Sequence, residues 1–220
     1  MDYFHRQLQL WSKEQQDSLL NKKIVIIGSG GLGCSVGLAL SGLGIGEMYL
    51  VDFDKVEPHN IHRQIAFKIS DEKQYKSEVL AKLITDRSFV TKATPFIKNF
   101  AEFSALNLEA DIIIDSTDNL ETRQEIDAYA KSKNIPWIYG SVEAFRGQVA
   151  LFEQAKFEDV FKVAKLDPVG IAAPMVMHIA SLQANLVTRY FVGLPVQKDK
   201  LHYVHFNEDG EYCLNKYSLL

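Results

Sequence analysis

The chain has 220 residues and a formal net charge of −4 without long blocks of like charge, which argues against nucleic acid or an anionic membrane surface as a partner. Its 47% hydrophobic and 24% charged residues are typical of a folded globular protein, and no run reaches the roughly 18 apolar residues of a membrane span. Two cysteines, Cys34 and Cys213, are too few for a disulfide framework or a four-cysteine zinc site. Residues 1–16 are unlike a signal peptide, and we expect a cytoplasmic protein.

The first part of the chain predicts an arm followed by alternating strands and helices. Residues 3–20 predict an amphipathic helical arm with apolar anchors at Leu8, Trp11, Leu19 and Leu20. We then expect, in chain order, a strand at 24–27, a helix at 31–43 ended by Gly44 and Gly46, a strand at 47–52, a helix at 76–86, strands at 91–97 and 111–115, a helix at 121–133 and a strand at 137–140. Since crossovers between parallel strands are right-handed, this part predicts a Rossmann-like parallel sheet.

The last third of the chain has a different pattern. It predicts a strand at 147–152, an apolar helix at 171–192 with Pro174 near its start, and a hairpin of strands 201–206 and 212–217. We therefore expect one α/β domain over residues 1–220, with an arm at 1–20, a Rossmann-like half at 21–140 and a partly antiparallel half at 141–220. One mixed sheet should run through both halves, with helices on both faces.

A glycine-rich loop follows the first strand. Gly28, Gly30 and Gly33 fit the pattern G-x-G-x-x-G, with a strand before them and a helix after them. Such glycines permit a tight turn, a close approach of backbone to phosphate and close helix packing, while the helix N-terminus favours an anion. Asp52, 24 residues after Gly28, is placed to accept from ribose hydroxyls. The alternative is a tight turn without a ligand, and the motif does not distinguish NAD, FAD and ATP.

Polar and cationic residues follow the second strand. Asn60, Arg63 and Gln64 come after the acidic pair Asp52 and Asp54, and Lys76 precedes the next helix. Ligands of open α/β sheets bind at this carboxyl edge, and a departing pyrophosphate requires cations near its oxygens. Each cation taken alone would be a solvated surface charge, but their order after a nucleotide loop favours phosphate binding.

Asp118 and Asn119 follow the apolar strand at 111–115, so they also project from a carboxyl edge. A carboxylate there can hold Mg²⁺ against phosphate oxygens. The alternative is that both residues cap the helix that begins near Glu121.

These residues, taken in order, resemble the ThiF/MoeB/HesA family, the bacterial relatives of ubiquitin-activating enzymes. The likeness covers nearly the whole chain and rests on several ordered matches rather than on one glycine motif. The matching residues are Arg6-Gln7, Leu10-Trp11, Gly28-x-Gly30-Gly31-Leu32-Gly33, Asp52-Phe53-Asp54, Asn60-x-x-Arg63-Gln64, Lys76, Asp115-x-Thr117-Asp118-Asn119, Arg123, Gly147-Gln148 and Ser181-x-Gln183-Ala184.

The resemblance implies an adenylyltransferase that uses ATP and Mg²⁺ to activate the C-terminal glycine of a small ubiquitin-like sulfur carrier protein ending in Gly-Gly. It implies a homodimer in which Arg6 reaches the γ-phosphate in the partner subunit, while Asp118 binds Mg²⁺ and residues 141–220 dock the carrier. Arg6, Arg63, Lys76 and Asp118 would be catalytic. The implied nucleotide-binding residues are Gly28, Gly30, Gly31, Gly33, Asp52, Asp54, Asn60, Arg63, Gln64, Lys76, Asp118 and Asn119.

The chain departs from the family pattern in its cysteines. Many relatives carry two Cys-x-x-Cys pairs for zinc, and some carry a cysteine for sulfur transfer, whereas Cys34 and Cys213 both suit packing positions here. We therefore expect no zinc and no covalent sulfur transfer. Phe145, Arg146 and the methionines Met175 and Met177 lie where the family docks its carrier, although core packing is the default for helical methionines.

Four functions remain open from the sequence. The short chain favours the thiamine branch, whose carrier is ThiS-like, over MoeB-like activation of the molybdopterin carrier. An NAD-dependent oxidoreductase would explain the glycines and Asp52 but would leave Arg63, Lys76 and Asp118 without a role. A non-catalytic binding subunit is disfavoured because such subunits often lose these charged residues.

Overall fold

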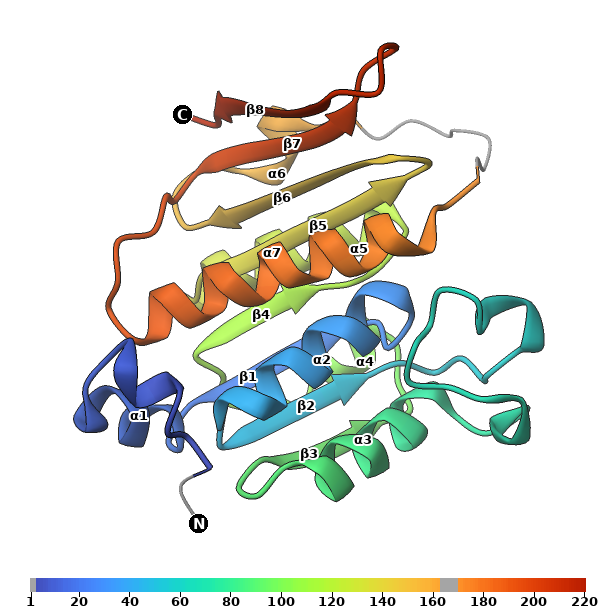
Figure 1. Cartoon of the computed structure of the whole chain (residues 1–220), viewed down its shortest axis with the longest axis vertical. Helices are drawn as coiled ribbons and strands as arrows, with labels where there is room; N and C mark the ends of the chain where they lie inside the picture. Colours follow the sequence, from blue (N-terminus) through green and yellow to red (C-terminus); the bar gives the residue numbers. More distant parts are fainter. Residues whose placement is uncertain (1–2, 163–169) are drawn as a thin grey trace.

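The computed structural model describes residues 3–162 and 170–220, so parts of the predicted arm (1–2) and docking half (163–169) lie outside the described residues. One eight-stranded sheet has the order β3-β2-β1-β4-β5-β6-β7-β8 (Figure 1). Neighbouring strands are parallel from β3 to β5 and antiparallel from β5 to β8, which confirms the predicted mixed sheet. The strands are β1 (Lys23–Ile27), β2 (Glu47–Val51), β3 (Lys92–Phe96), β4 (Ile112–Asp115), β5 (Trp137–Glu143), β6 (Arg146–Phe152), β7 (Lys200–Phe206) and β8 (Tyr212–Ser218).

Helices cover both faces of this sheet, as expected. One face carries α2 (Gly31–Leu43), α3 (Lys76–Arg87) and α7 (Ala173–Phe191), and the other carries α4 (Phe100–Ser104), α5 (Leu120–Lys133) and α6 (Phe157–Val160) (Figure 1). Alternate residues of β1 serve the two resulting cores: Ile24 and Ile26 pack in the first, and Val25 and Ile27 in the second. Burial on both faces explains why β1 is a continuous apolar run.

Most predicted elements are confirmed within a few residues, and α2 has the predicted bounds. Two helices, α4 and α6, were not predicted, nor were the 3-10 turns η2 (Pro58–Asn60) and η3 (Ile69–Asp71). These segments are too short to show a helical period. Among the described residues, no helix has the length and apolar character needed to cross a membrane.

The prediction of one helical arm over residues 3–20 is wrong in its continuity. The segment forms a 3-10 turn, η1 (Gln7–Gln9), and a separate helix, α1 (Lys13–Leu19). Ser12 starts the new helix, because its side chain caps the Gln15 amide and the Gln15 side chain accepts from the Ser12 amide. Of the four predicted anchors, Leu19 is fully buried and Trp11 partly buried, whereas Leu8 and Leu20 are exposed.

The first turn of α2 packs directly on the glycine loop. A Cβ added at Gly33 would lie 2.0 Å from the carbonyl oxygen of Gly28, so the two backbones are in contact. At Gly42, near the other end of the same helix, an added Cβ would meet nothing within 4 Å.

These two positions give opposite predictions for the same substitution. Gly33→Ala should lower the free energy of unfolding by about 1–3 kcal/mol or more, because the methyl group overlaps backbone that has no free space. Gly42→Ala, the matched control, should raise it by about 0.5–1 kcal/mol by removing backbone freedom from the unfolded chain. Urea denaturation would measure both, and equal effects at the two positions would contradict the packing described.

Candidate functional site

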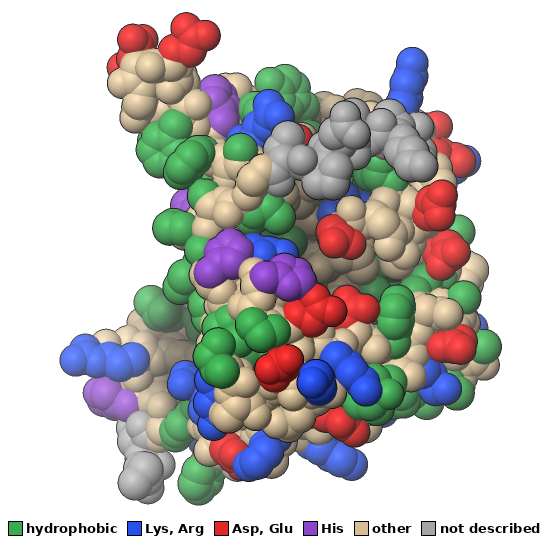
Figure 2. Space-filling view, turned by 90° about the vertical axis from the view of Figure 1, so that its right-hand side faces the viewer, with side chains coloured by type: hydrophobic (Ala, Val, Ile, Leu, Met, Phe, Trp, Pro, Cys, Tyr) green, Lys and Arg blue, Asp and Glu red, His purple; other side chains and the backbone are tan. Residues whose placement is uncertain are grey.

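The carboxyl ends of the parallel strands surround a cavity of about 300 Å³. The loops that follow β1, β2, β3 and β4 all contribute to its lining, as does β5. Figure 2 views this side of the molecule, where the surface is hollowed and bordered by acidic side chains. The predicted site residues that line the cavity are Gly28, Gly30, Gly31, Asp52, Asp54, Arg63, Gln64, Lys76, Asp118 and Asn119.

The glycine loop brings backbone N–H groups to this cavity. Gly28 has φ +91°, and an added Cβ would lie 2.7 Å from the carbonyl oxygen of Ser116, so only glycine fits there. Helix α2 begins just beyond, with Gly30 as its N-cap, no side-chain cap and no acidic residue in its first turn. Its first N–H groups therefore have no partner within the helix and favour an anion. Gly33 does not line the cavity, but it permits the close packing described above.

Asp52 lies beside the glycine loop, as predicted. One carboxylate oxygen accepts from the amide of Ser29 at 2.6 Å and the other from the amide of Asp54 at 2.7 Å. Burial raises the pKa of the Asp52 carboxyl, while these two amides and Lys76 oppose the rise. The two hydrogen bonds hold the carboxylate in one orientation at the cavity wall.

Lys76 is a nearly buried cation whose charge is already paired. Its Nζ lies 2.9 Å from the carboxylate of Asp54, and its side chain is 7% exposed against 56% for Asp54. The backbone reinforces the pair, since the Lys76 amide donates to the Asp54 carbonyl at 2.9 Å. The position of the lysine at the start of α3 is thus fixed before any ligand arrives.

Arg63 and Gln64 reach the cavity from the loop after β2. The Arg63 guanidinium donates to Oδ1 of Asn60 at 3.2 Å, and Asn60 itself is buried and does not line the cavity. Gln64 is 5% exposed, and its Oε1 has no hydrogen-bond partner among the described residues. A buried amide oxygen without a partner at a cavity wall suits a site that is completed by a polar ligand.

The structure separates the two roles that the sequence left open for Asp118 and Asn119. Asn119 is the N-cap of α5, and its Oδ1 accepts from the amide of Thr122 at 2.7 Å. The carboxylate of Asp118 is exposed, lines the cavity and forms no hydrogen bond or ion pair within the described part of the chain. The capping alternative therefore holds for Asn119, and Asp118 remains available to a ligand.

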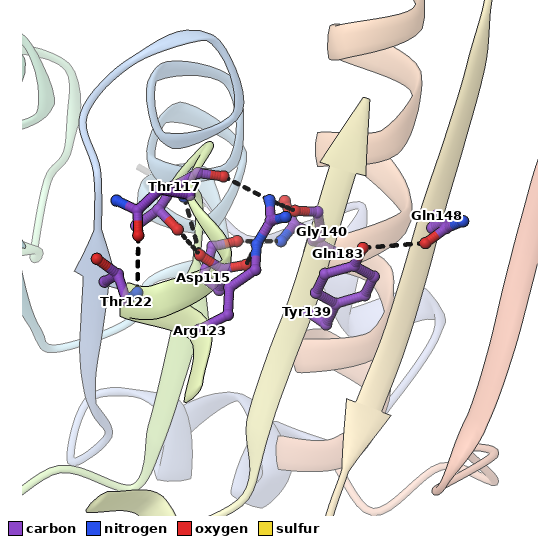
Figure 3. A network of polar contacts seen from close by, with 9 residues as sticks. Asp115, Thr117, Thr122, Arg123, Tyr139, Gly140, Gln148 and Gln183 are labelled. Carbon is purple, nitrogen blue, oxygen red and sulfur yellow. Dashed lines mark hydrogen bonds and ion pairs between the residues drawn. The ribbon is translucent and has the colours of Figure 1, made fainter. Parts of the chain in front are cut away.

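Arg123 and Asp115 form a buried ion pair next to Thr117, in the loop after β4 (Figure 3). Arg123 donates to Asp115 at 2.9 Å, and their side chains are 5% and 0% exposed. The same guanidinium donates to the carbonyls of Thr117 and Gly140, at 2.6 and 3.1 Å. Burial raises the pKa of the Asp115 carboxyl, although the positive charge of Arg123 opposes the rise. Arg123 therefore connects β4, the loop after it and β5.

Sequence reasoning did not assign site roles to several residues that line the cavity. Arg123 was recognised only as a match to the family, as was its partner Asp115, which is buried and does not line the cavity. Lys98 and Asn99 follow the end of β3, and Ser141 lies in β5. The carboxyl-edge rule that indicated the residues after β1, β2 and β4 would also have indicated Lys98 and Asn99, because β3 ends at the same edge of the sheet.

Arg6 does not reach the cavity of its own chain. It is exposed in the arm, which packs at the far end of α2: the Gln7 side chain donates to the Gly42 carbonyl, and Phe4 covers Gly44. Because α2 has 13 residues, about 20 Å of helix separates the arm from the glycine loop. A role for Arg6 in catalysis thus requires the cavity of another subunit.

Neither cysteine lines this cavity. Cys34 is fully buried, and burial raises the pKa of its thiol to about 12, while Cys213 is half-buried in β8. Within residues 3–162 and 170–220, no group of three or more His, Cys, Asp or Glu side chains could hold a metal ion.

The apolar residues expected at the docking surface differ in exposure. Phe145 is 67% exposed at the turn between β5 and β6, and Met177 is 48% exposed on α7. Met175 is 5% exposed and belongs to the core. The default expectation of core packing is therefore correct for Met175 and wrong for Met177.

Known proteins match this chain along most of its length. The family described as the ThiF family matches residues 4–212. The chain is 34% identical over 181 residues to the adenylyltransferase and sulfurtransferase MOCS3 of Dictyostelium discoideum, a match covering 77% of this chain and 43% of that protein. It thus spans less than half the length of that relative.

Two bacterial relatives are matched over more of their length. The sulfur carrier protein ThiS adenylyltransferase of Escherichia coli strain K12 is 29% identical, with 84% of this chain and 78% of the relative covered. The molybdopterin-synthase adenylyltransferase of the same strain is 29% identical, with 81% and 76% covered. The crystal structure of E. coli MccB superposes with a TM-score of 0.86 at 23% identity, covering 99% of this chain and 69% of that one, which shows the shared fold.

The buried ion pair predicts a specific pattern of stability. Arg123→Met should lower the free energy of unfolding by about 3–5 kcal/mol, because it leaves the Asp115 charge buried without its counter-ion. The double variant Asp115→Asn/Arg123→Met should regain part of this loss, since no unpaired charge remains. Denaturant titration measures both, and Lys13→Met, which breaks only the exposed pair with Asp17, is the control and should leave the midpoint unchanged. Wild-type stability of Arg123→Met would contradict the assignment.

Proposed function

The chain belongs to the ThiF family, and on this premise we propose that it adenylates the C-terminal glycine of a small ubiquitin-like sulfur carrier protein. The observation that carries the proposal is the convergence of three features on one cavity: an uncapped helix N-terminus, the cations Lys76 and Arg63, and the exposed carboxylate of Asp118. These charged groups suit a polyphosphate better than a dinucleotide, because a dinucleotide carries less charge.

In the proposed reaction, a carboxylate oxygen of the carrier attacks the α-phosphorus of ATP. A new P–O bond forms, the bond from the α-phosphorus to the bridging oxygen breaks, and pyrophosphate leaves with the electron pair. The nucleophile is already ionised, so no protein base is required. Catalysis then consists of positioning the reactants and stabilising charge as it develops.

Different residues of the cavity suit the phosphates and the ribose of ATP. The first N–H groups of α2 would bind phosphate oxygens, and Asp52 would accept from the ribose hydroxyls. Lys76 and Arg63 would stabilise the charge of the departing pyrophosphate. Since Lys76 is paired with Asp54, the phosphates must compete with an exposed carboxylate for this lysine.

The donor set also suits Mg²⁺. This cation binds through one or two carboxylates together with substrate phosphates and water, so the exposed carboxylate of Asp118 is sufficient on the protein side. When bound, the ion neutralises phosphate charge and orients the phosphates for attack. Asp118 would hold it, and Arg123 would fix the loop that carries Asp118.

The carrier would occupy the second half of the chain. A second cavity of about 410 Å³ shares Ser141 with the first. It is lined by Glu143, Arg146, Gln148 and the two tyrosines Tyr203 and Tyr217, among others. An extended carboxyl-terminal tail lying across β5 and β6 would thus lead to the nucleotide cavity.

A homodimer is part of the proposal. Arg6 is exposed, and about 20 Å of helix separates its arm from the glycine loop of its own chain. It would therefore serve the γ-phosphate in the partner subunit. For the pathway, we propose a ThiS-like carrier and thiamine thiazole synthesis. A molybdopterin carrier is the alternative, because relatives of both kinds match this chain to a similar degree.

Two other functions explain fewer of the observations. An NAD-dependent oxidoreductase would leave Lys76, Arg63 and Asp118 without a function at the cavity. A non-catalytic binding subunit would not need these charges to be kept in place by Asp54, Asn60 and a buried arginine.

The lysine gives the sharpest test of this proposal. Lys76→Met should reduce carrier-dependent ATP–pyrophosphate exchange by about 100-fold or more, because a cation aimed at developing charge is lost. The variant should fold, since methionine fills the same space and Asp54 is left in solvent. Lys82→Met on the same helix, which breaks only the exposed pair with Asp86, is the matched control and should stay within about twofold of wild type. Near-wild-type exchange by a folded Lys76→Met protein would count against the proposal.

A further inference from the structure

Two neighbours hold the guanidinium of Arg63 at separate nitrogens. One terminal nitrogen lies 2.8 Å from Nε2 of His62, and the other donates to Oδ1 of Asn60 at 3.2 Å. Asn60 was expected at the site from the sequence, whereas His62 was not assigned a function there.

The contact with Arg63 requires an acceptor on the imidazole of His62. Arginine carries only donors and stays charged, so Nε2 of His62 must be the acceptor. This hydrogen bond therefore forms with the tautomer that carries its proton on Nδ1. A doubly protonated ring could not accept this hydrogen bond and would place a second positive charge beside the guanidinium.

The backbone around this contact is regular. In the turn η2 and the residues after it, the amides of Arg63 and Gln64 both donate to the carbonyl of Asn60, at 3.2 and 3.1 Å. The Cα of Arg63 is thus fixed, but its side chain still has several rotatable bonds. The contacts with Asn60 and His62 restrict these bonds at the charged end.

The remaining donors of Arg63 are free for a ligand. A guanidinium has five N–H donors, and two of them are used by His62 and Asn60, which leaves three without a partner within the described residues. Arg63 lines the nucleotide cavity, so a polyphosphate there can accept from these donors.

We infer that His62 is a positioning residue for nucleotide binding: its imidazole and Asn60 together hold the Arg63 guanidinium so that the free donors face the phosphates. This inference rests on the proposed function, because it takes Arg63 as a ligand of the nucleotide. His62 acts only through Arg63 and does not itself touch the nucleotide.

Another histidine of the same loop offers a matched control. His59 is also exposed, but its Nδ1 lies 3.2 Å from the carboxylate of Glu57 and not beside a cavity residue. Replacing either histidine removes an exposed imidazole from one loop, yet only His62 should affect the nucleotide.

The test is the dissociation constant of MgATP, measured by equilibrium binding to the full chain. His62→Leu should weaken binding about 3- to 10-fold, the loss expected for one partly exposed hydrogen bond to a charged group. His62→Gln should restore most of the affinity, because its amide oxygen can accept from Arg63. His59→Leu should bind like wild type.

The double variant Arg63→Met/His62→Leu tests whether His62 affects MgATP binding through Arg63. If His62 acts through Arg63, the double variant should bind MgATP no more weakly than Arg63→Met alone. Wild-type affinity of His62→Leu, or an added loss in the Arg63→Met background, would overturn the inference while leaving the proposed function in place. Failure of the wild-type chain to bind MgATP would overturn both.

Discussion

The site depends on backbone contact around the glycine loop. The loop after β1 passes so close to Ser116 and to the first turn of α2 that a Cβ at Gly28 or Gly33 would overlap backbone atoms. This contact joins the β1 and β4 loops at the carboxyl edge of the sheet, where Arg123 then fixes the β4 loop from below. The free N–H groups of α2 and the carboxylate of Asp118 consequently open into the same cavity.

Three cationic side chains of the cavity are held in place before a ligand enters. Lys76 is paired with Asp54, and the buried Arg123 is paired with Asp115. The guanidinium of Arg63 is held by Asn60 and His62. The pairing of Lys76 fixes its position but makes the phosphates compete with Asp54. An exposed carboxylate is a weak competitor, since solvent screens its attraction, so a highly charged ligand can take over the lysine. Pairing of this kind favours a polyphosphate over ligands of lower charge.

Much of this site could be predicted from a single rule. The carboxyl ends of parallel strands lie at the same edge of the sheet, so the residues that follow them come together. The rule joined the residues after β1, β2 and β4 without any knowledge of side-chain contacts. It could not reveal the bond between Asp115 and Arg123, because that contact depends on how α5 packs on β4. Nor could periodicity show that Ser12 breaks the arm into two pieces, since the apolar residues of 3–20 fit one helix equally well. The exposure of Asp118 and the capping by Asn119 were likewise decided by the local turn rather than by spacing.

The proposed activity of the cavity is the activation of a carrier carboxylate with ATP. Its most direct test is ATP–pyrophosphate exchange by the wild-type protein with a panel of small ubiquitin-like carriers, each compared with a form lacking its terminal Gly-Gly. We predict exchange that requires both Mg²⁺ and the intact Gly-Gly end, and the carrier that supports it would distinguish the thiamine from the molybdopterin branch. Binding of NADH without any binding of ATP would contradict the account.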